Sequence, residues 1–217
     1  YTIDGLKENM WVNQAELNGE VGVDDDENGF VDDIHGYDFA NDDGDSTDDH
    51  GHGSHCSGTI GAKGDDGEGV VGVNWNVSIM GIKFLTASGG GSLENAIKSI
   101  DYATQMGANI MSNSWGGGGY SKALEESIQR ASEAGILFIA AAGNHKANND
   151  VSPTYPATYA VDNVISVAAI DNTGSKASFS CYGRNTVHIA APGHNILSTT
   201  KNGGYASYSG TSMATPH

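Results

Sequence analysis

The chain has 217 residues, of which 38% are hydrophobic, and its 27 acidic and 10 basic side chains give a formal net charge of -17. A chain of this size can bury one core, and no long linker divides it, so we expect a single domain over residues 1–217. The negative charge disfavours nucleic acid and anionic membranes as partners. No apolar segment is long enough to span a bilayer, so no membrane association is expected.

The amino-terminal part of the chain concentrates the negative charge. Twelve acidic residues lie between Asp24 and Asp49. Oxygen-bearing side chains alternate along residues 24–32, and Gly29 permits the sharp turn of a calcium loop. The predicted Ca²⁺ ligands are Asp24, Asp26, Asn28, the carbonyl of Phe30, Asp32 and Asp33. A solvated acidic loop is the alternative, because the twelfth position is His35 and not the Glu of an EF-hand.

Beyond the acidic segment, β-rich stretches alternate with amphipathic ones. Residues 77–85 predict a strand, and Ser92 is the expected N-cap of a helix that Gly107 ends. The buried face of this helix is expected to carry Leu93, Ala96, Ile97, Ile100 and Ala103. Residues 108–115 predict the next strand.

The same alternation continues in the second half of the chain. Residues 121–134 predict a helix that Gly135 ends. Its inward-facing residues are expected to be Ala123, Leu124, Ser127, Ile128 and Ala131. Residues 136–142 are almost wholly apolar, which is typical of a central strand buried on both faces, and residues 164–170 predict a further strand. The pattern predicts a three-layer α/β fold, with a mostly parallel sheet and helices on both faces.

Three segments carry residues suited to acyl-transfer chemistry. Residues 210–217 read Gly-Thr-Ser-Met-Ala-Thr-Pro-His, residues 52–59 surround His52 with small residues, and residues 141–144 end an apolar strand in Ala-Ala-Gly-Asn. In this order the motifs resemble those of the subtilisin family of serine proteases, which carries His-Gly-Thr-His, Ala-Ala-Gly-Asn and Gly-Thr-Ser-Met-Ala-Thr-Pro-His. Residues 112–116 and 155–157 also match that family, so the resemblance covers nearly the whole chain.

The resemblance implies a subtilisin-like domain that hydrolyses peptide bonds through an acyl-enzyme. Ser212 would be the nucleophile, His52 the general base and Asn144 the donor to the oxyanion. The residue types suit this chemistry, because a Ser hydroxyl needs an adjacent base and the tetrahedral oxyanion needs a preorganised donor.

The resemblance also implies extended polypeptide substrates. The residues expected to bind them are Gly89, Gly90, Gly91, Ser112, Ser114, Trp115, Gly116, Ala141, Ala142 and Gly143. The primary specificity pocket is expected between residues 114–116 and residues 141–143, and a flexible connector is the alternative for residues 89–91. Structural Ca²⁺, secretion, a monomeric state and the protein's own propeptide as a second partner complete these expectations.

The chain departs from the family at its amino terminus. Relatives carry Asp-Thr-Gly shortly before the segment that corresponds to the one beginning at Tyr1, and Asp4 occupies a position that the family does not use for catalysis. The orienting aspartate of the triad is therefore expected upstream of this chain, and the last helices of the domain beyond His217. The chain would then be a partial catalytic domain that lacks activity alone.

Two other interpretations and one structural question stay open. A noncatalytic calcium-binding module of protease fold would explain the missing aspartate. A zinc hydrolase could use His50, His52 and His55, although Ser54 replaces the Asp expected between them and the Asn144 strand would remain unexplained. Separately, Cys56 and Cys181 could form one disulfide or remain as buried free thiols.

Overall fold

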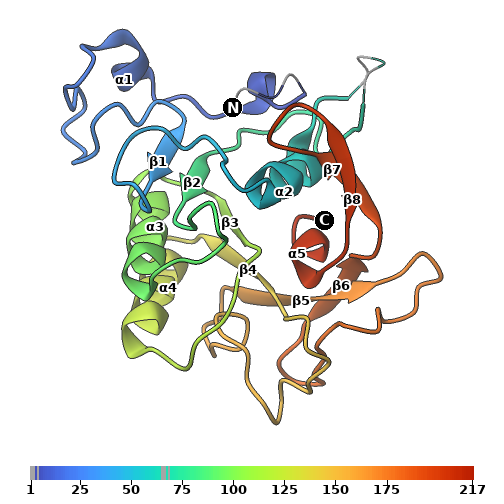
Figure 1. The fold of residues 1–217 in the computed structure, drawn as a ribbon. Helices are drawn as coiled ribbons and strands as arrows, with labels where there is room; N and C mark the ends of the chain where they lie inside the picture. Colours follow the sequence, from blue (N-terminus) through green and yellow to red (C-terminus); the bar gives the residue numbers. More distant parts are fainter. Residues whose placement is uncertain (1–2, 4, 65–66, 68) are drawn as a thin grey trace. The chain divides into compact units, whose positions relative to one another are not determined.

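The computed structural model describes residues 3, 5–64, 67 and 69–217, so Tyr1 and Asp4 lie outside the described residues (Figure 1). The chain folds as two compact units. The first, here called the histidine unit, comprises Tyr1–Ser99 and Thr199–Tyr205, and the second, the serine unit, comprises Ile100–Ser198 and Ala206–His217. The histidine unit is thus built from two separate stretches of the chain.

The serine unit contains a four-stranded parallel sheet (Figure 1). Its strands are β3 (Ile110–Asn113), β4 (Leu137–Ala141), β5 (Val164–Ile170) and β6 (Ile189–Pro192), in the order β3-β4-β5-β6. All three neighbouring pairs are parallel, which confirms the predicted sheet type, and β5 has the predicted bounds. Because the strands are parallel, their carboxyl ends share one edge of the sheet, the edge where ligands bind in such folds.

Helix α3 (Leu93–Gln105) lies between the predicted N-cap Ser92 and Gly107, and helix α4 (Lys122–Glu133) is one residue shorter at each end than the predicted 121–134. The hydroxyl oxygens of Ser92 and Ser121 each accept a hydrogen bond from the backbone N–H three residues later, at 3.0 and 3.3 Å. Helix α3 is followed by Gly107 at φ 72°, and α4 by a glycine at φ 78°. These contacts satisfy helix ends that would otherwise leave backbone groups unpaired.

The buried faces of these two helices follow the predicted periodicity except at Leu93, Ile97 and Ala123, and Ile97 is half-buried. The buried members are Ala96, Ile100 and Ala103 on α3, and Leu124, Ser127, Ile128 and Ala131 on α4. Leu93 is 50% exposed and Ala123 is also exposed, so both inward assignments were wrong. Leu93 is the first residue of its helix, ahead of the covered part, and Ala123 lies about 100° around the helix from Leu124.

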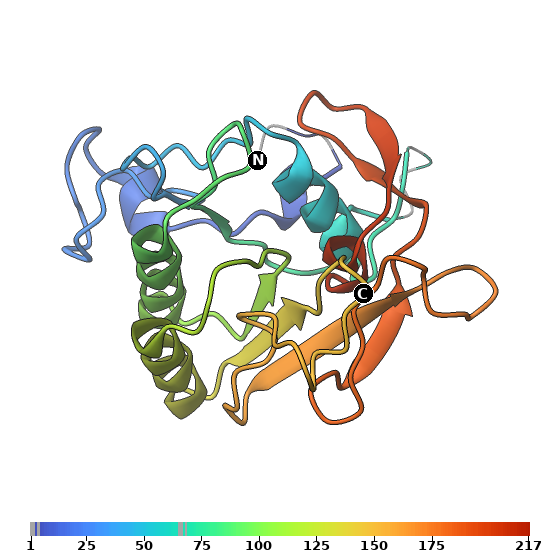
Figure 2. The ribbon, with the colours of Figure 1, turned by 60° about the horizontal axis from the view of Figure 1, so that its bottom comes forward.

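Helices cover both faces of the sheet, as the sequence predicts. The short helix α5 (Thr211–Ala214) packs on β5, where Ala214 contacts the cluster that contains Val167 and Ala169. Successive side chains of a strand point to opposite faces, so Phe138 and Ala140 of β4 lie on the face away from α5, where both are fully buried. Helix α4 packs on β4, which places it over that second face (Figure 2).

The remaining strands are short. In the histidine unit, β1 (Gly36–Asp38) pairs in parallel with β2 (Gly81–Lys83), and a hairpin of β7 (Ile196–Thr199) and β8 (Tyr205–Tyr208) follows β6. The strand predicted over residues 77–85 is therefore only three residues long, because its partner β1 offers only three paired residues. Neither β1 nor the strands after residue 170 were predicted.

The histidine unit holds the helices η1 (Lys7–Asn9), α1 (Gln14–Asn18) and α2 (His52–Gly61). Small residues let α2 pack closely, since a Cβ atom added at Gly61 would lie 2.3 Å from a methyl carbon of Val77. None of the helices in the described part of the chain combines the length and the apolar character that a membrane span requires.

Candidate active site

Helix α5 presents Ser212 at its start. Its neighbours Thr211, Met213 and Ala214 are buried, whereas Ser212 is only half-buried. Three buried side chains therefore anchor the short helix and leave the Ser212 hydroxyl partly accessible, as a nucleophile requires.

Two reciprocal hydrogen bonds join Ser212 to the end of β3. The Ser212 hydroxyl donates to the carbonyl oxygen of Ser114 at 3.1 Å, and the Ser114 hydroxyl donates to the carbonyl oxygen of Ser212 at 2.7 Å. The predicted substrate-binding segment 112–116 thus lies beside the predicted nucleophile, although the two are 98 residues apart in the chain.

Thr211 holds the side chain of Asn144 in one orientation. The Asn144 Oδ1 atom accepts hydrogen bonds from the Thr211 backbone N–H at 2.8 Å and from the Thr211 hydroxyl at 3.0 Å. The same hydroxyl accepts a hydrogen bond from the N–H of Gly143 at 3.1 Å. Because Oδ1 is fixed, the Nδ2 donor of Asn144 is also oriented, and it makes no hydrogen bond to the described part of the chain.

Two nitrogen atoms flank one point beside Ser212. A Cβ atom added at Gly210 would lie 3.5 Å from Asn144 Nδ2 and 3.6 Å from the backbone nitrogen of Ser212. Gly210 has no side chain at this point, so both nitrogens lie close to a position that no side chain of Gly210 fills. Paired N–H donors of this kind suit the stabilisation of a negatively charged oxygen.

The segments predicted to line the specificity pocket leave neighbouring strands at the same edge. Asn113 of β3 pairs with Ala140 of β4, so residues 114–116 and 141–143 continue side by side. Ala141 and Ala142 are buried, whereas the Ser112 side chain and Gly116 are exposed. The structure thus brings both predicted linings together.

The turn before β5 closes this edge of the sheet. The carbonyl oxygen of Tyr155 accepts the N–H of Gly117 at 3.1 Å, and a Cβ atom added at Gly116 would lie 3.1 Å from the same oxygen. The Trp115 indole donates to Asn113 Oδ1 at 3.0 Å. The segment 114–117 is therefore held between its own strand and residue 155.

His52 is the first residue of α2 in the histidine unit, and Asp48 supports the start of that helix. The Asp48 carboxylate accepts the backbone N–H groups of His50, Gly51 and Ser54 at 2.9, 2.7 and 2.7 Å, and the Ser54 hydroxyl at 2.6 Å. Burial alone would raise the pKa of Asp48, but these hydrogen bonds, led by the Ser54 hydroxyl, lower it below its usual range. Sequence reasoning missed this role, because an Asp four residues before a helix start is not a standard cap.

The surroundings of His52 favour its neutral form. Burial lowers the pKa of His52, and positive charge on His50 and His55 lowers it further, while Asp48 acts in the opposite direction. The rings of His50 and His52 lie 6.4 Å apart between centroids, and His55 is fully buried. A neutral imidazole is the form that accepts a proton.

These three histidines do not form a metal site. Among the described residues, the one set of three or more His, Cys, Asp or Glu ligand atoms within 4.8 Å of one another contains none of them. The zinc interpretation of the sequence therefore has no support from the geometry. Cys56 and Cys181 are both buried and neither forms a disulfide, which is the thiol alternative of the two.

Residues 89–91 follow a turn in the histidine unit. The carbonyl oxygen of Gly90 accepts the backbone N–H of Thr86 at 2.8 Å and its hydroxyl at 3.1 Å, and Gly89 has φ 80°. At Gly91, an added Cβ atom would lie 2.8 Å from atoms of Phe84 and Leu85. The absence of side chains here therefore serves a tight turn as well as any substrate contact.

The acidic loop brings together three carboxylates. Oxygen atoms of Glu16, Asp24 and Asp26 lie within 4.8 Å of one another. Glu16, on α1, is 4% exposed, and sequence reasoning missed it because it lies outside the repeating Asp pattern. Within the described residues none of the three forms an ion pair, and each accepts a backbone N–H hydrogen bond, at 2.7 Å for Glu16, 3.0 Å for Asp24 and 3.3 Å for Asp26.

The other predicted ligands of this loop have different surroundings. Asp33 is fully buried, and its two oxygens accept hydrogen bonds from Asn13 and Asn28 side chains at 2.8 and 3.0 Å. The Asn28 Oδ1 atom accepts the Phe30 N–H at 2.7 Å. The carboxylate of Asp32 accepts the N–H of Gly22 at 2.9 Å and is not among the three that converge.

Comparison with known proteins identifies the family of the chain. Residues 4–217 match the model of the subtilase family. Subtilisin-like protease 1 of Plasmodium berghei (strain Anka) is 38% identical over 234 aligned residues, which cover 100% of this chain and 39% of that protein. Subtilisin DY of Bacillus licheniformis is 40% identical over 185 residues, or 85% of this chain and 66% of that protein.

A solved structure shows the same fold. The crystal structure of a cold adapted subtilisin-like serine proteinase superposes with a TM-score of 0.75 at 40% sequence identity, and covers 84% of this chain and 63% of its own. The chain spans 39% of the length of the Plasmodium berghei relative. On the match of residues 4–217 and on these identities, the chain belongs to the subtilase family of subtilisin-like serine proteases.

Proposed function

We propose that the full-length protein is a serine endopeptidase in which Ser212 is the nucleophile, His52 the general base and Asn144 the oxyanion donor. The observation that carries the proposal is the pair of hydrogen bonds from Thr211 to Asn144 Oδ1, here called the Thr211 clasp. It leaves an oriented amide donor beside the helix that contains Ser212. The half-buried Ser212 and the lowered pKa of His52 support the other two roles.

In the proposed mechanism, Ser212 Oγ attacks the carbonyl carbon of a polypeptide substrate while neutral His52 takes its proton. The carbonyl oxygen becomes negatively charged and accepts hydrogen bonds from Asn144 Nδ2 and the Ser212 backbone nitrogen. Protonated His52 then gives its proton to the leaving amine, and water releases the acyl group by the same steps in reverse. An aspartate from outside these 217 residues is proposed to orient His52.

The test is covalent labelling of the full-length protein by a fluorophosphonate, a serine-directed inhibitor. We expect loss of peptidase activity together with one added group on the peptide that contains Ser212, found by mass spectrometry. A full-length protein that neither cleaves polypeptides nor reacts at Ser212 would be a noncatalytic member of the family.

The environment of His52 predicts how activity depends on pH. His52 must be neutral to act as a base, so activity rises as the pH passes upward through its pKa. Positive charge on His50 lowers that pKa, so His50→Gln is expected to move the midpoint of the kcat/KM profile to higher pH. The triad carboxylate would raise the midpoint of both proteins equally, so the comparison isolates His50. A midpoint that stays the same or moves to lower pH would contradict the prediction.

We also propose that Ca²⁺ binds the acidic loop. Glu16, Asp24 and Asp26 would hold it, since hard carboxylate oxygens are the ligands that Ca²⁺ prefers, and the buried Asp33 would support the loop through Asn28. The ion would neutralise the three carboxylates and tie α1 to residues 24–33. Asp32, the Phe30 carbonyl and Asn28 itself remain candidate ligands.

Chelation is expected to lower the melting temperature of the full-length protein by about 5–10 °C, because an ion at 100 times its Kd contributes about 2.7 kcal/mol. Glu16→Gln should remove most of this chelator-dependent difference, whereas Glu133→Gln, on the exposed side of α4, should retain it. Equal melting temperatures in calcium and in excess chelator, measured by scanning calorimetry, would refute the site.

The remaining proposals follow from family membership. Extended polypeptides would be the substrates and the protein's own propeptide a second ligand. Secretion and a monomeric state are proposed on the same basis.

A further inference from the structure

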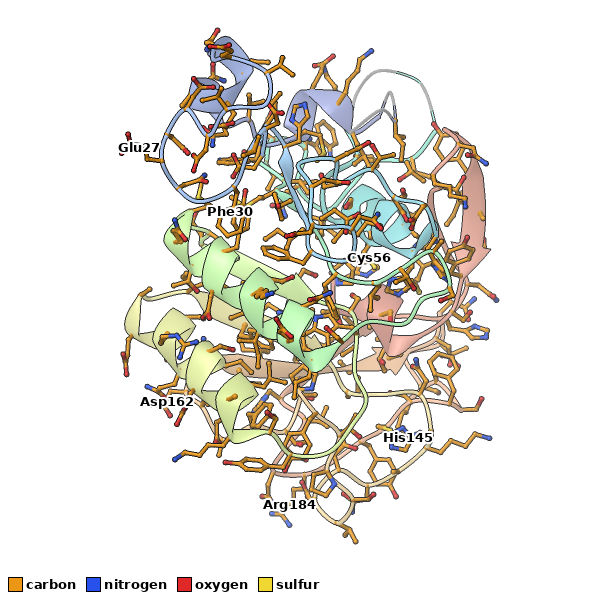
Figure 3. All side chains as sticks on the ribbon, turned by 60° about the vertical axis from the view of Figure 1, so that its left-hand side comes forward. Glu27, Phe30, Cys56, His145, Asp162 and Arg184 are labelled. Atoms are coloured by element: carbon orange, nitrogen blue, oxygen red, sulfur yellow. The ribbon has the colours of Figure 1, made fainter. Side chains whose placement is uncertain are left out.

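Hydrogen-bonded polar side chains that the mechanism above does not use connect the loop after Asn144 to a residue between β5 and β6. These side chains are His145, Asn149, Thr154 and Cys181, all in the serine unit. Asn149 and Cys181 are fully buried, and His145 lies on the loop that leaves β4 (Figure 3).

The donors and acceptors of these side chains fix the direction of each hydrogen bond in the series. Asn149 Nδ2 donates to the carbonyl oxygen of Ala142 at 2.9 Å, so Asn149 Oδ1 must be the acceptor for the Thr154 hydroxyl at 3.1 Å. A hydroxyl has one proton, so the Thr154 oxygen can only accept from His145 Nε2, which lies 3.3 Å away. The proton of a neutral His145 is therefore on Nε2.

This tautomer leaves Nδ1 of His145 as an acceptor. The Sγ atom of Cys181 lies 3.5 Å from it, so the thiol donates to the ring. The sequence of bonds runs from the Cys181 thiol through His145, Thr154 and Asn149 to the carbonyl oxygen of Ala142. We refer to these four side chains as the relay.

The relay surrounds the residue proposed to stabilise the oxyanion. It ends at Ala142, two residues before Asn144, and it passes through His145, the residue after Asn144. The Cys181 backbone N–H also donates to the carbonyl oxygen of Gly143 at 2.9 Å. The backbone on both sides of Asn144 is therefore anchored.

The packing around Gly143 leaves little room for a side chain at this position. A Cβ atom added there would lie 3.1 Å from Cys181 Sγ, 3.1 Å from His145 Cε1 and 3.2 Å from a methyl carbon of Thr154. Three members of the relay thus leave no room for a side chain at Gly143, the residue before Asn144.

We infer that Thr154 and Asn149 are positioning residues for the reaction, which act by holding residues 142–145 so that Asn144 Nδ2 meets the transition-state oxygen. The inference rests on the proposed function of Asn144. Thr211 fixes the Asn144 side chain by hydrogen bonds, and the relay holds the backbone near Asn144 through the carbonyl oxygen of Ala142. Two separate sets of contacts therefore determine the position of the Asn144 Nδ2 donor.

The first test replaces Thr154 in the full-length enzyme. Thr154→Val keeps the shape but breaks the relay, and kcat is expected to fall about tenfold with KM changed less than twofold, because a 1 Å displacement costs about a hundredfold and this shift is smaller. Thr154→Ser keeps the hydroxyl and should restore most of kcat. Thr173→Val makes the same change in an exposed turn and should leave kcat unchanged.

The second test asks whether the effect passes through Asn144. In an Asn144→Leu background, Thr154→Val should cause no further loss of kcat, whereas a merely structural role would add its full loss. An unchanged kcat for Thr154→Val, a loss confined to KM, or additive losses would each overturn the inference. Failure of the proposed function differs, since neither the wild-type protein nor its variants would then cleave polypeptides.

Discussion

Ser212→Ala is expected to reduce the kcat of the full-length enzyme by about 10⁶-fold, the order known for subtilisin, from which the figure is taken. The variant lacks the oxygen that forms the acyl-enzyme, while the donors of Asn144 and the binding segments remain. For that reason the variant should still hydrolyse the peptide about 10³–10⁴-fold faster than the uncatalysed reaction in water. Peptide hydrolysis under single-turnover conditions measures both quantities.

The stability of this variant should change little. It loses one half-buried hydrogen bond, to the carbonyl oxygen of Ser114, worth about 0.5–1.5 kcal/mol. Ser175→Ala, in an exposed turn, is the matched control and should retain full activity. Substantial activity in a folded Ser212→Ala protein would assign the nucleophile to another residue.

The second large effect is expected for Asn144→Leu. Leucine has a similar volume but no N–H donor, so kcat should fall about 10²–10³-fold, again the magnitude known for subtilisin. KM should change little, because the lost hydrogen bond forms only as negative charge develops on the substrate oxygen. Steady-state kinetics on one peptide substrate separate the two constants.

The control for this prediction is Asn202→Leu, the same change at an exposed position of the β7–β8 turn. The Asn144 variant also leaves the Thr211 hydroxyl without its acceptor, which adds a stability cost of about 1–3 kcal/mol. A rise in KM with unchanged kcat would show that Asn144 binds the ground state and would contradict its proposed role.

Much of the sheet and its helices could be predicted from the sequence because the local pattern and the end signals agree. Ser92 and Ser121 are caps that hydrogen-bond their own helices, and glycines end both helices at positive φ. The strand at 164–170 is continuous and buried, so its bounds could be predicted as well. In contrast, β1 is three residues long within an acidic loop, and a pattern of period two cannot be read from three residues.

The candidate site was predicted by residue type and order, but its contacts were not. Ser212, His52 and Asn144 have recognisable neighbours in the chain, whereas the Thr211 clasp joins residues 67 positions apart. Glu16 likewise approaches Asp24 and Asp26 only through the fold. Contacts of this kind depend on tertiary packing, and tertiary packing produces no repeating pattern of residues from which the contacts could be predicted.

The two-part construction of the histidine unit has a consequence for biosynthesis. Thr199 donates to the carbonyl oxygen of Ser54 at 2.8 Å, and Lys201 to that of Asp49 at 2.6 Å, so α2 and the residues before it are bound by residues 145 and 152 positions later. At about 5–20 residues per second, roughly 5–20 s separate residue 99 from residue 205 on the ribosome. A nascent chain therefore carries His52 for seconds before residues 199–205 complete the unit that contains it.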